Sequence, residues 1–207
     1  MKALLIVDVQ YDFLPGGALG VPKGDRIISR INEIIPDFKC VIQTQDWHPA
    51  DHSSFAANNQ RKKPFETVEM EYGEQILWPV HCVQGMHGAD FHHDLDQSAT
   101  QLVIRKGFRP QMDSYSAFFE NDHKTTTGLH GYLQERQVDE VFISGLATDF
   151  CVKWSALDAI KKGYKIYIVE DAVSGIDIDN SVQKSIDEMK DSGVLFLHSS
   201  EVHRYFE

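Results

Sequence analysis

Basic residues are scarce in this sequence of 207 residues. Its 20 lysines and arginines stand against 31 aspartates and glutamates, so the formal net charge is −11. The sequence also lacks any lysine- or arginine-rich run and any apolar run long enough to span a bilayer. Its apolar start, MKALLIVDVQ, is broken by Asp8 and has no small-residue cleavage site, unlike a signal peptide. We therefore expect neither nucleic acids nor membranes as partners.

Cysteine is equally sparse. Cys40, Cys82 and Cys151 are odd in number and too few for a disulfide framework. Free thiols fit a reducing compartment, so the sequence predicts a cytoplasmic protein. Internal repeats, low-complexity tracts and proline- or serine-rich linkers are missing too. We interpret residues 1–207 as a single domain.

Six short apolar runs, rich in β-branched residues, alternate with helical patterns. The runs are ALLIVDV from Ala3, CVIQTQD from Cys40, LVIRKG from Leu102, VFISGL from Val141, KIYIVEDAV from Lys165 and VLFLHS from Val194. Helical spacing of apolar residues is present in residues 25–35, 149–162 and 179–191. This alternation predicts an α/β fold: a doubly wound, mainly parallel six-stranded sheet flanked by helices in three layers.

Two long segments, residues 47–100 and 108–128, interrupt this alternation. The first contains most of the histidines. Long irregular segments in a compact domain are usually binding loops or lids, and ligands of such sheets bind beyond the carboxyl ends of the strands. We interpret residues 47–100 as an irregular insertion that carries a metal site and a lid.

Polar residues stand where four of the predicted strands end. Asp8 lies in the first run, Asp46 ends the second, Lys106 is in the third, and Cys151 follows the turn after the fourth. In a parallel sheet these residues converge on one edge, where a carboxylate, an ammonium and a thiol can form an activated nucleophile. Each also fits a structural role: Asp8 as a cap, Lys106 as a solvated strand end, and Cys151 as a core residue.

The chemistry explains why this combination is useful. Cys151 lies where the helical pattern of residues 149–162 begins, and helix N-terminal amides and a nearby cation both favour the thiolate. A carboxylate can accept the thiol proton and later return it to a leaving amine. Asp149 would oppose a thiolate if its side chain faced the sulfur, so we expect it to face away.

A second group of residues has metal-ligand character. The motif DWHPADHSSF supplies Asp46, His48 and His52, and WPVHC supplies His81. Asp-x-His with a distant histidine offers three ligands to a divalent ion and leaves positions open for water and substrate. Zinc, iron and manganese all suit such a set, and the spacing does not decide between His52 and His81.

Six motifs occur in order: IVDVQYDFLPGGAL, DWHPADHSSF, WPVHCVQG, VIRKG, DSYSAF and SGLATDFCV. Together they closely resemble the nicotinamidase (pyrazinamidase) branch of the isochorismatase-like cysteine hydrolases. The resemblance extends over almost the whole chain. It implies the same three-layer fold and a catalytic triad of Asp8, Lys106 and Cys151.

The resemblance also implies the remaining site residues. The matches to the metal ligands are Asp46, His48 and His81, with His52 at the place of a further ligand or of a neighbour to the ligands. The matches to the oxyanion hole are the N–H groups of Ala147 and Cys151, next to a cis bond at Leu146–Ala147. The matches to the substrate pocket are Phe13, Trp78, Tyr115 and Ala147.

The implied reaction is hydrolysis of nicotinamide to nicotinate and ammonia through a cysteine thioester. One divalent metal ion, zinc in the first place and otherwise iron or manganese, is expected to position the pyridine ring. Deamidation of pyrazinamide and a place in NAD salvage are implied too.

Three other functions have different sequence signatures. Branches that hydrolyse isochorismate or N-carbamoyl amides typically lack the Asp-x-His…His set, which is present here. A non-catalytic binding module would lack the nucleophile or its base. A thiol redox protein would need a second cysteine near Cys151, and we interpret Cys82 as a packing residue. The sequence leaves open whether the chain forms a homo-oligomer.

Overall fold

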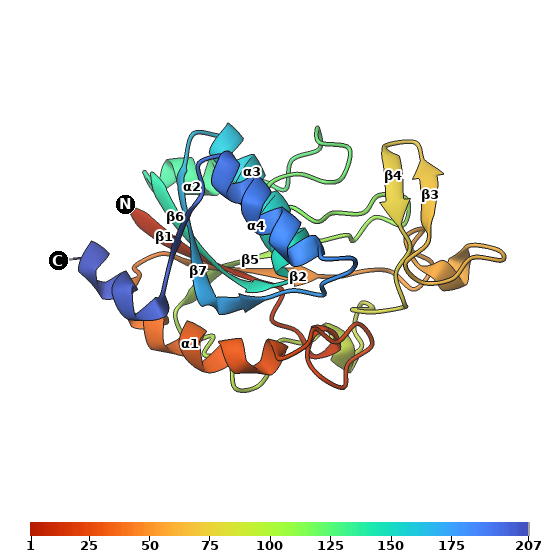
Figure 1. Ribbon diagram of the computed structural model, residues 1–207, viewed down its shortest axis with the longest axis horizontal. Coiled ribbons are helices and arrows are strands. Elements are labelled where there is room, and N and C mark those ends of the chain that lie inside the picture. Colours follow the sequence, from red (N-terminus) through yellow and green to blue (C-terminus); the bar gives the residue numbers. More distant parts are fainter. Residues whose placement is uncertain (207) are drawn as a thin grey trace.

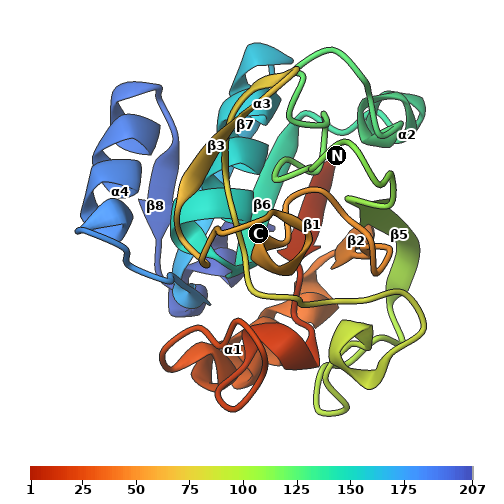
Figure 2. The same ribbon diagram turned by 90° about the vertical axis from the view of Figure 1, so that its right-hand side faces the viewer.

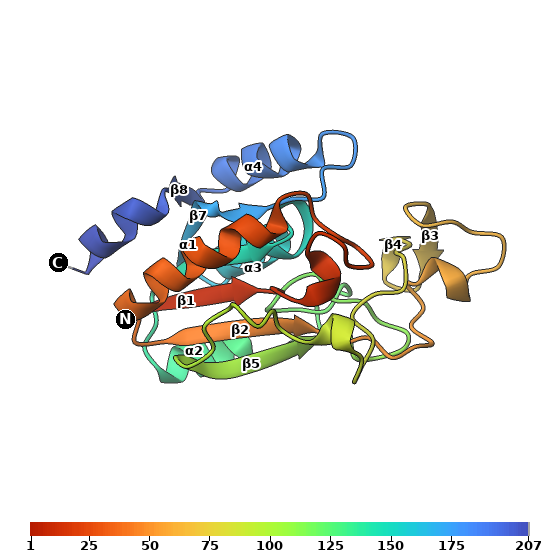
Figure 3. The same cartoon turned by 90° about the horizontal axis from the view of Figure 1, so that it is seen from below.

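A six-stranded parallel sheet forms the centre of the computed structural model, which describes residues 1–206 (Figure 1). In spatial order the strands are β5 (Thr100–Lys106), β2 (Val41–Asp46), β1 (Lys2–Val7), β6 (Glu140–Leu146), β7 (Lys165–Ser174) and β8 (Leu195–Leu197). Every neighbouring pair is parallel. Figure 3 shows β5 and β8 at opposite edges of the sheet.

Helices cover both faces of this sheet. Helix α1 (Ile27–Ile34) and the 3₁₀ helix Ser199–Tyr205 lie on one face, and the other face carries α2 (Leu129–Glu135), α3 (Lys153–Lys161) and α4 (Ser181–Asp191). Figure 2 shows α1 below the sheet and α2 and α3 above it. The predicted doubly wound, three-layer α/β fold is therefore confirmed.

The apolar strands follow from this arrangement. Successive side chains of a strand point to opposite faces, so Leu4 and Ile6 pack with the isoleucines of α1, while Leu5 and Val7 pack under α2 and α3. Because both faces are covered, neither set of positions is polar, and β1 reads as one continuous apolar run.

Three details differ from the sequence-based expectation. Residues 47–100 contain an antiparallel hairpin, β3 (Thr67–Met70) and β4 (Gly73–Ile76), whose largely exposed and polar strands give no apolar run. Helix α2 was not predicted because it has only seven residues, with a glycine among them. The helix predicted from residue 149 has a π-turn at Thr148–Val152, and its regular part begins at Lys153.

The topology creates a crevice at the carboxyl ends of β1 and β6. The chain leaves β1 through α1 on one face to reach β2, whereas it enters β6 from α2 on the opposite face. Such a switch point is where ligands bind in open α/β sheets. The hairpin β3–β4 lies beyond these strand ends, on the right in Figure 1. No helix within residues 1–206 combines the length and apolar character needed to cross a membrane.

The close approach of β6 to β1 requires glycine at position 145. Gly145 has φ +108°, and a Cβ atom there would overlap the backbone of Val7. We expect Gly145→Ala to lower the free energy of unfolding by about 2–3 kcal/mol, since it combines an unfavourable φ with overpacking. Gly163 has φ +90° but open space around it, so Gly163→Ala is the control, with a cost of about 1 kcal/mol. Equal losses of stability in urea denaturation would contradict the steric explanation.

Candidate active site

A buried lysine joins the ends of three strands. Lys106, the last residue of β5, is 1% exposed, and its Nζ lies 2.9 Å from Oδ2 of Asp8 and 2.5 Å from Oδ1 of Asp46. Asp8 directly follows β1, and Asp46 ends β2. The Lys106 ammonium also donates to the carbonyl oxygen of Ser114 at 3.2 Å. The parallel sheet thus brings together the strand-end residues that the sequence indicated.

Burial and ion pairing together determine the protonation states of Lys106, Asp46 and Asp8. Burial opposes the ammonium form of Lys106, but Asp46 and Asp8 outweigh it and raise the pKa of Lys106 well above its usual value. Burial likewise opposes the carboxylate form of Asp46, yet Lys106 and His48 hold its pKa well below the usual range. For Asp8 burial prevails, and its pKa is raised despite Lys106. Lys106 and Asp46 are therefore fixed charges, and Asp8 is the group suited to exchange a proton.

Cys151, in the π-turn after β6, completes this group. Its Sγ lies 3.6 Å from Nζ of Lys106, and the ligand atoms of Asp8, Asp46 and Cys151 all lie within 4.8 Å of one another. Burial raises the pKa of the Cys151 thiol well above its usual value, although Lys106 acts against this. Burial thus outweighs the Lys106 charge, and the resting thiol is protonated. A reaction with this sulfur as nucleophile requires a base that takes the thiol proton.

Asp8 is placed to be that base. Its Oδ1 accepts a hydrogen bond from Oγ1 of Thr44 at 2.5 Å. Its Oδ2 is buried and, within residues 1–206, accepts no hydrogen bond of good geometry, although it pairs electrostatically with Lys106. A buried carboxyl group whose pKa is raised and which lies beside a thiol is suited to accept the thiol proton.

The turn after β6 presents the thiol and turns Asp149 away from it. The peptide bond Leu146–Ala147 is cis, as the resemblance implied, and the π-turn Thr148–Val152 follows. The Asp149 carboxylate accepts hydrogen bonds from the N–H groups of Ile176 and Asp177 at 3.0 and 2.9 Å. The expectation that Asp149 faces away from the sulfur is confirmed.

A second group, Asp46, His48 and His81, could hold a metal ion. Its ligand atoms lie within 4.8 Å of one another, and Oδ2 of Asp46 is 3.4 Å from Nε2 of His48 and 3.7 Å from Nε2 of His81. Both Nδ1 atoms face backbone carbonyls, of Gly107 at 2.9 Å and Pro79 at 2.8 Å. With Nδ1–H donating to these carbonyls, each ring directs its Nε2 toward the Asp46 carboxylate. Such a set of converging ligand atoms fits a divalent cation.

His52 lies beside this group rather than within it. Its ring centroid is 4.5 Å from that of His48, and its Nδ1 lies 2.7 Å from Oγ of Ser54. Burial lowers the pKa of His52, so its imidazole is neutral. A second possible ligand set, His48, His52 and Asp113, shares His48 with the first.

Sequence reasoning missed several residues that hold the site together. Gln10 fixes Asp46 through its backbone: Nε2 of Gln10 donates to the Asp46 carbonyl at 2.8 Å, and Oε1 accepts from the Asp46 N–H at 2.8 Å. Asp113 is 2% exposed and accepts from Nε2 of Gln75 at 3.1 Å. An isolated glutamine or aspartate in a loop carries no spacing signal, so only the folded chain identifies these contacts.

All of the predicted pocket residues line one small cavity. Phe13, Trp78, Tyr115 and Ala147 line it together with Cys151, and Asp46, His48 and His81 lie in its wall. Sequence reasoning missed Leu19, Asp113 and Ile176, which line it as well.

Hydrogen bonds fix one of these walls. The Tyr115 hydroxyl accepts from Nε1 of Trp78 at 3.1 Å and from Nε2 of Gln75 at 2.8 Å. Because Gln75 belongs to β4, the hairpin that the sequence did not predict positions this side of the cavity. Aromatic walls beside a thiol suit a flat ring that carries an electrophilic carbon.

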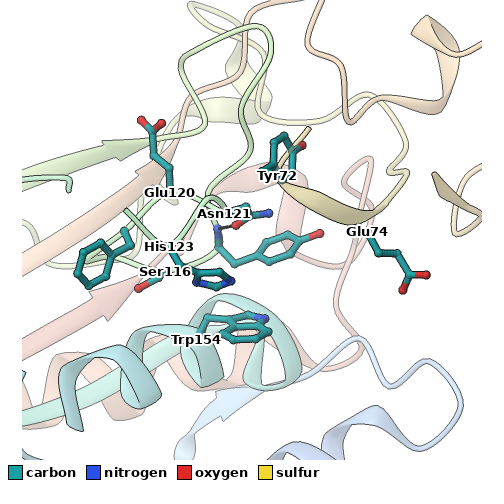
Figure 4. A pocket seen from close by; sticks show the side chains of 9 residues that line it. Tyr72, Glu74, Ser116, Glu120, Asn121, His123 and Trp154 are labelled. Atoms are coloured by element: carbon teal, nitrogen blue, oxygen red, sulfur yellow. Dashed lines mark hydrogen bonds between the residues drawn. The ribbon is translucent and has the colours of Figure 1, made fainter. Parts of the chain in front are cut away.

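A larger pocket, which Tyr115 also lines, is shown in Figure 4. Tyr72 and Glu74 of the hairpin region, His123 and Trp154 line it, and the rings of His123 and Trp154 are 5.4 Å apart. It contains no cysteine and none of the residues of the metal group. The reactive groups therefore converge in the smaller cavity.

Lys106 is predicted to stabilise the metal-free protein strongly. We expect Lys106→Met to lower the free energy of unfolding by about 3–5 kcal/mol, because it leaves two buried carboxylates without a counter-charge. Lys165→Met is the control, since Lys165 is exposed and lies 4.0 Å from Glu140; its loss should cost at most about 1 kcal/mol. Urea denaturation of both variants tests this, and similar costs would contradict it.

The chain is similar to known proteins over most of its length. The chain is 50% identical over 200 residues to a nicotinamidase of Acinetobacter baylyi, covering 97% of this chain and 94% of that protein. It also matches a nicotinamidase/pyrazinamidase structure from Acinetobacter baumannii with a TM-score of 0.96 and 53% identity, over 97% of both chains. A pyrazinamidase of Pyrococcus horikoshii, solved in complex with zinc, matches with a TM-score of 0.77 and 37% identity, over 95% of this chain and 98% of that one.

The family model matches almost the whole sequence. Residues 2–201 match the model of the isochorismatase domain. The strands, the strand-end residues and the cavity described above all lie within this range. The chain therefore belongs to the isochorismatase family.

Proposed function

We propose that this protein is a nicotinamidase, which hydrolyses nicotinamide to nicotinate and ammonia with Cys151 as nucleophile. The observation that carries the proposal is that Cys151, which lines a small aromatic cavity, contacts Lys106, which in turn pairs with Asp8. The nicotinamidases and pyrazinamidases that the chain resembles support the choice of a pyridine or pyrazine amide.

The cavity suits the shape of such a substrate. In the proposed complex the ring lies flat among Phe13, Trp78 and Tyr115, which places the carboxamide carbon above Cys151. Pyrazinamide has the same outline, with one ring carbon replaced by nitrogen, so we propose it as a second substrate.

The first half-reaction forms a thioester. Asp8 takes the thiol proton of Cys151, and the sulfur attacks the carboxamide carbon. The N–H groups of Ala147 and Cys151 stabilise the resulting oxyanion. Asp8 then delivers its proton to the amide nitrogen, the C–N bond breaks, and ammonia leaves. Lys106 stabilises the charges of Asp8 and of the sulfur throughout.

The second half-reaction regenerates the thiol. Asp8 accepts a proton from a water molecule, and the resulting hydroxide attacks the thioester carbon. The C–S bond breaks, Asp8 returns its proton to the sulfur of Cys151, and the product leaves as nicotinic acid, which releases its carboxyl proton to water or ammonia and becomes nicotinate. Over the whole reaction, the oxygen atom and one proton of water enter the acid. The other proton of water replaces the thiol proton that left with ammonia.

Asp46, His48 and His81 are the proposed ligands of one divalent metal ion. Two imidazoles and a carboxylate suit zinc, and the related pyrazinamidase from Pyrococcus horikoshii was solved with zinc; iron and manganese suit the same donors. When bound, the ion would supply a positive charge and an open coordination position for the ring nitrogen of the substrate. His52 packs against His48 and is proposed to orient it.

The compartment and role follow from the same proposal. The three cysteines of the chain are unpaired, in keeping with a reducing cytoplasm. Nicotinamide hydrolysis would make the protein part of NAD salvage.

The nucleophile can be tested by replacing its sulfur. We expect Cys151→Ala to lower ammonia release from nicotinamide at least about 1000-fold, because no thioester can form. Cys40→Ala is the control, since Cys40 is also a buried free cysteine but packs under α2, and it should keep near-normal turnover. Calorimetric binding of nicotinamide to the Cys151 variant shows whether its pocket is intact. Turnover near the wild-type level in this variant would refute covalent catalysis.

The metal ligands can be tested by metal content. We expect His81→Ala to weaken zinc binding about 100-fold or more, because one of three protein ligands is lost. His203→Ala, at an exposed site in the C-terminal 3₁₀ helix, is the control and should bind zinc as the wild type does. Competition with a chromophoric chelator measures both affinities. Equal affinities of the two variants would show that His81 is not a ligand.

A further inference from the structure

Three histidines surround one tyrosine on the surface, outside the cavity described above. The ring of Tyr11 lies 4.1 Å from that of His87, 5.0 Å from that of His92 and 6.2 Å from that of His93, measured between centroids. None of these residues lines the cavity that contains Cys151. The proposed reaction assigns no role to this group of four residues.

The side chains of His92, His93 and Asp94 lie close enough together to be considered as ligands of one metal ion. One ligand atom each from His92, His93 and Asp94 lies within 4.8 Å of the other two. In a tetrahedral zinc site the ligand atoms are about 3.4 Å apart, because each bond is about 2.0–2.1 Å long. Small rotations of exposed side chains would therefore close this set around an ion. His93 and Asp94 are 70% and 67% exposed, so water can fill the remaining positions.

Existing contacts already orient these groups. Nδ1 of His93 lies 2.8 Å from the Tyr11 hydroxyl, and Nε2 of His93 lies 3.3 Å from Oδ1 of Asp94. The other carboxylate oxygen of Asp94 is 3.8 Å from Nδ1 of His92. For His93, a partner on Nδ1 leaves Nε2 facing a carboxylate, the arrangement typical of metal-binding histidines. Nδ1 of His92 is held instead by a hydrogen bond from the Asp94 N–H at 3.2 Å.

We propose that His92, His93 and Asp94 form a second divalent transition-metal site, separate from the one at Asp46. Two imidazoles and one carboxylate favour zinc, copper or nickel over magnesium or calcium, which prefer all-oxygen sites. The site is open to solvent, so its affinity for zinc is lower than that of the buried set.

The segment that carries this site is bonded to the catalytic edge. The Tyr11 N–H donates to the Asp90 carbonyl at 3.1 Å, and the His92 N–H donates to the Val9 carbonyl at 3.0 Å. Nε2 of Gln10 donates both to the Ala89 carbonyl and to the Asp46 carbonyl. An ion at His92 and His93 would thus stabilise the loop that follows Asp8.

The experiment counts zinc ions per chain. Tag-free protein is stripped of metal, loaded with one equivalent of zinc, and then dialysed against excess free zinc before elemental analysis. The wild type should hold two equivalents, and the double variant His92→Ala/His93→Ala should hold one. Asp94→Asn, which keeps the side-chain shape, should weaken the second equivalent at least tenfold.

Two variants serve as controls. His87 is exposed, lies in the same loop and also contacts Tyr11, but it is outside the ligand set. The His87→Ala variant should therefore keep two equivalents of zinc. His81→Ala should keep the surface equivalent, so that loss of the buried site is distinguished from loss of this one. A single equivalent in the wild type, or two in the His92/His93 variant, would overturn the proposal.

Discussion

The ion pairing of Lys106 is the interaction on which the rest of this site depends. An ammonium buried at the end of β5 is stable only with counter-charges in contact, and Asp8 and Asp46 provide them at 2.9 and 2.5 Å. The same contacts tie β5, β2 and β1 together at their carboxyl ends. The Lys106 ammonium therefore connects Asp8, the proposed base, with the thiol of Cys151 and with Asp46 of the proposed metal group.

The two carboxylates beside Lys106 differ because their surroundings differ. Asp46 faces Lys106 and also His48 and His81, so its negative charge is held. One oxygen of Asp8 accepts a hydrogen bond from Thr44 and the other pairs with Lys106, yet burial prevails and raises the pKa of Asp8. Two similar residues on neighbouring strands thereby acquire separate tasks, one structural and electrostatic, the other suited to proton transfer.

The long segment between β2 and β5 builds much of the site without regular structure. It supplies His48 and His81, and its hairpin places Gln75 against Tyr115. Its last part, residues 87–94, packs on the turn after Asp8, where Gln10 connects the two regions through the Ala89 carbonyl. The proposed surface zinc site and the proposed catalytic metal group are therefore attached to the same short turn.

The sequence by itself determined the parallel sheet and the strand-end residues, because two-sided burial leaves continuous apolar runs and polar residues stand out where those runs end. It could not determine the hairpin, which has no apolar run, or the short helix α2. Sequence spacing left His52 and His81 equivalent, and the family resemblance implied His81. In the folded chain His81 faces Asp46, while His52 packs against His48. The sequence could not identify Gln10 or Asp113 either. Their contacts join residues up to 79 positions apart, and such proximity is a property of the tertiary structure.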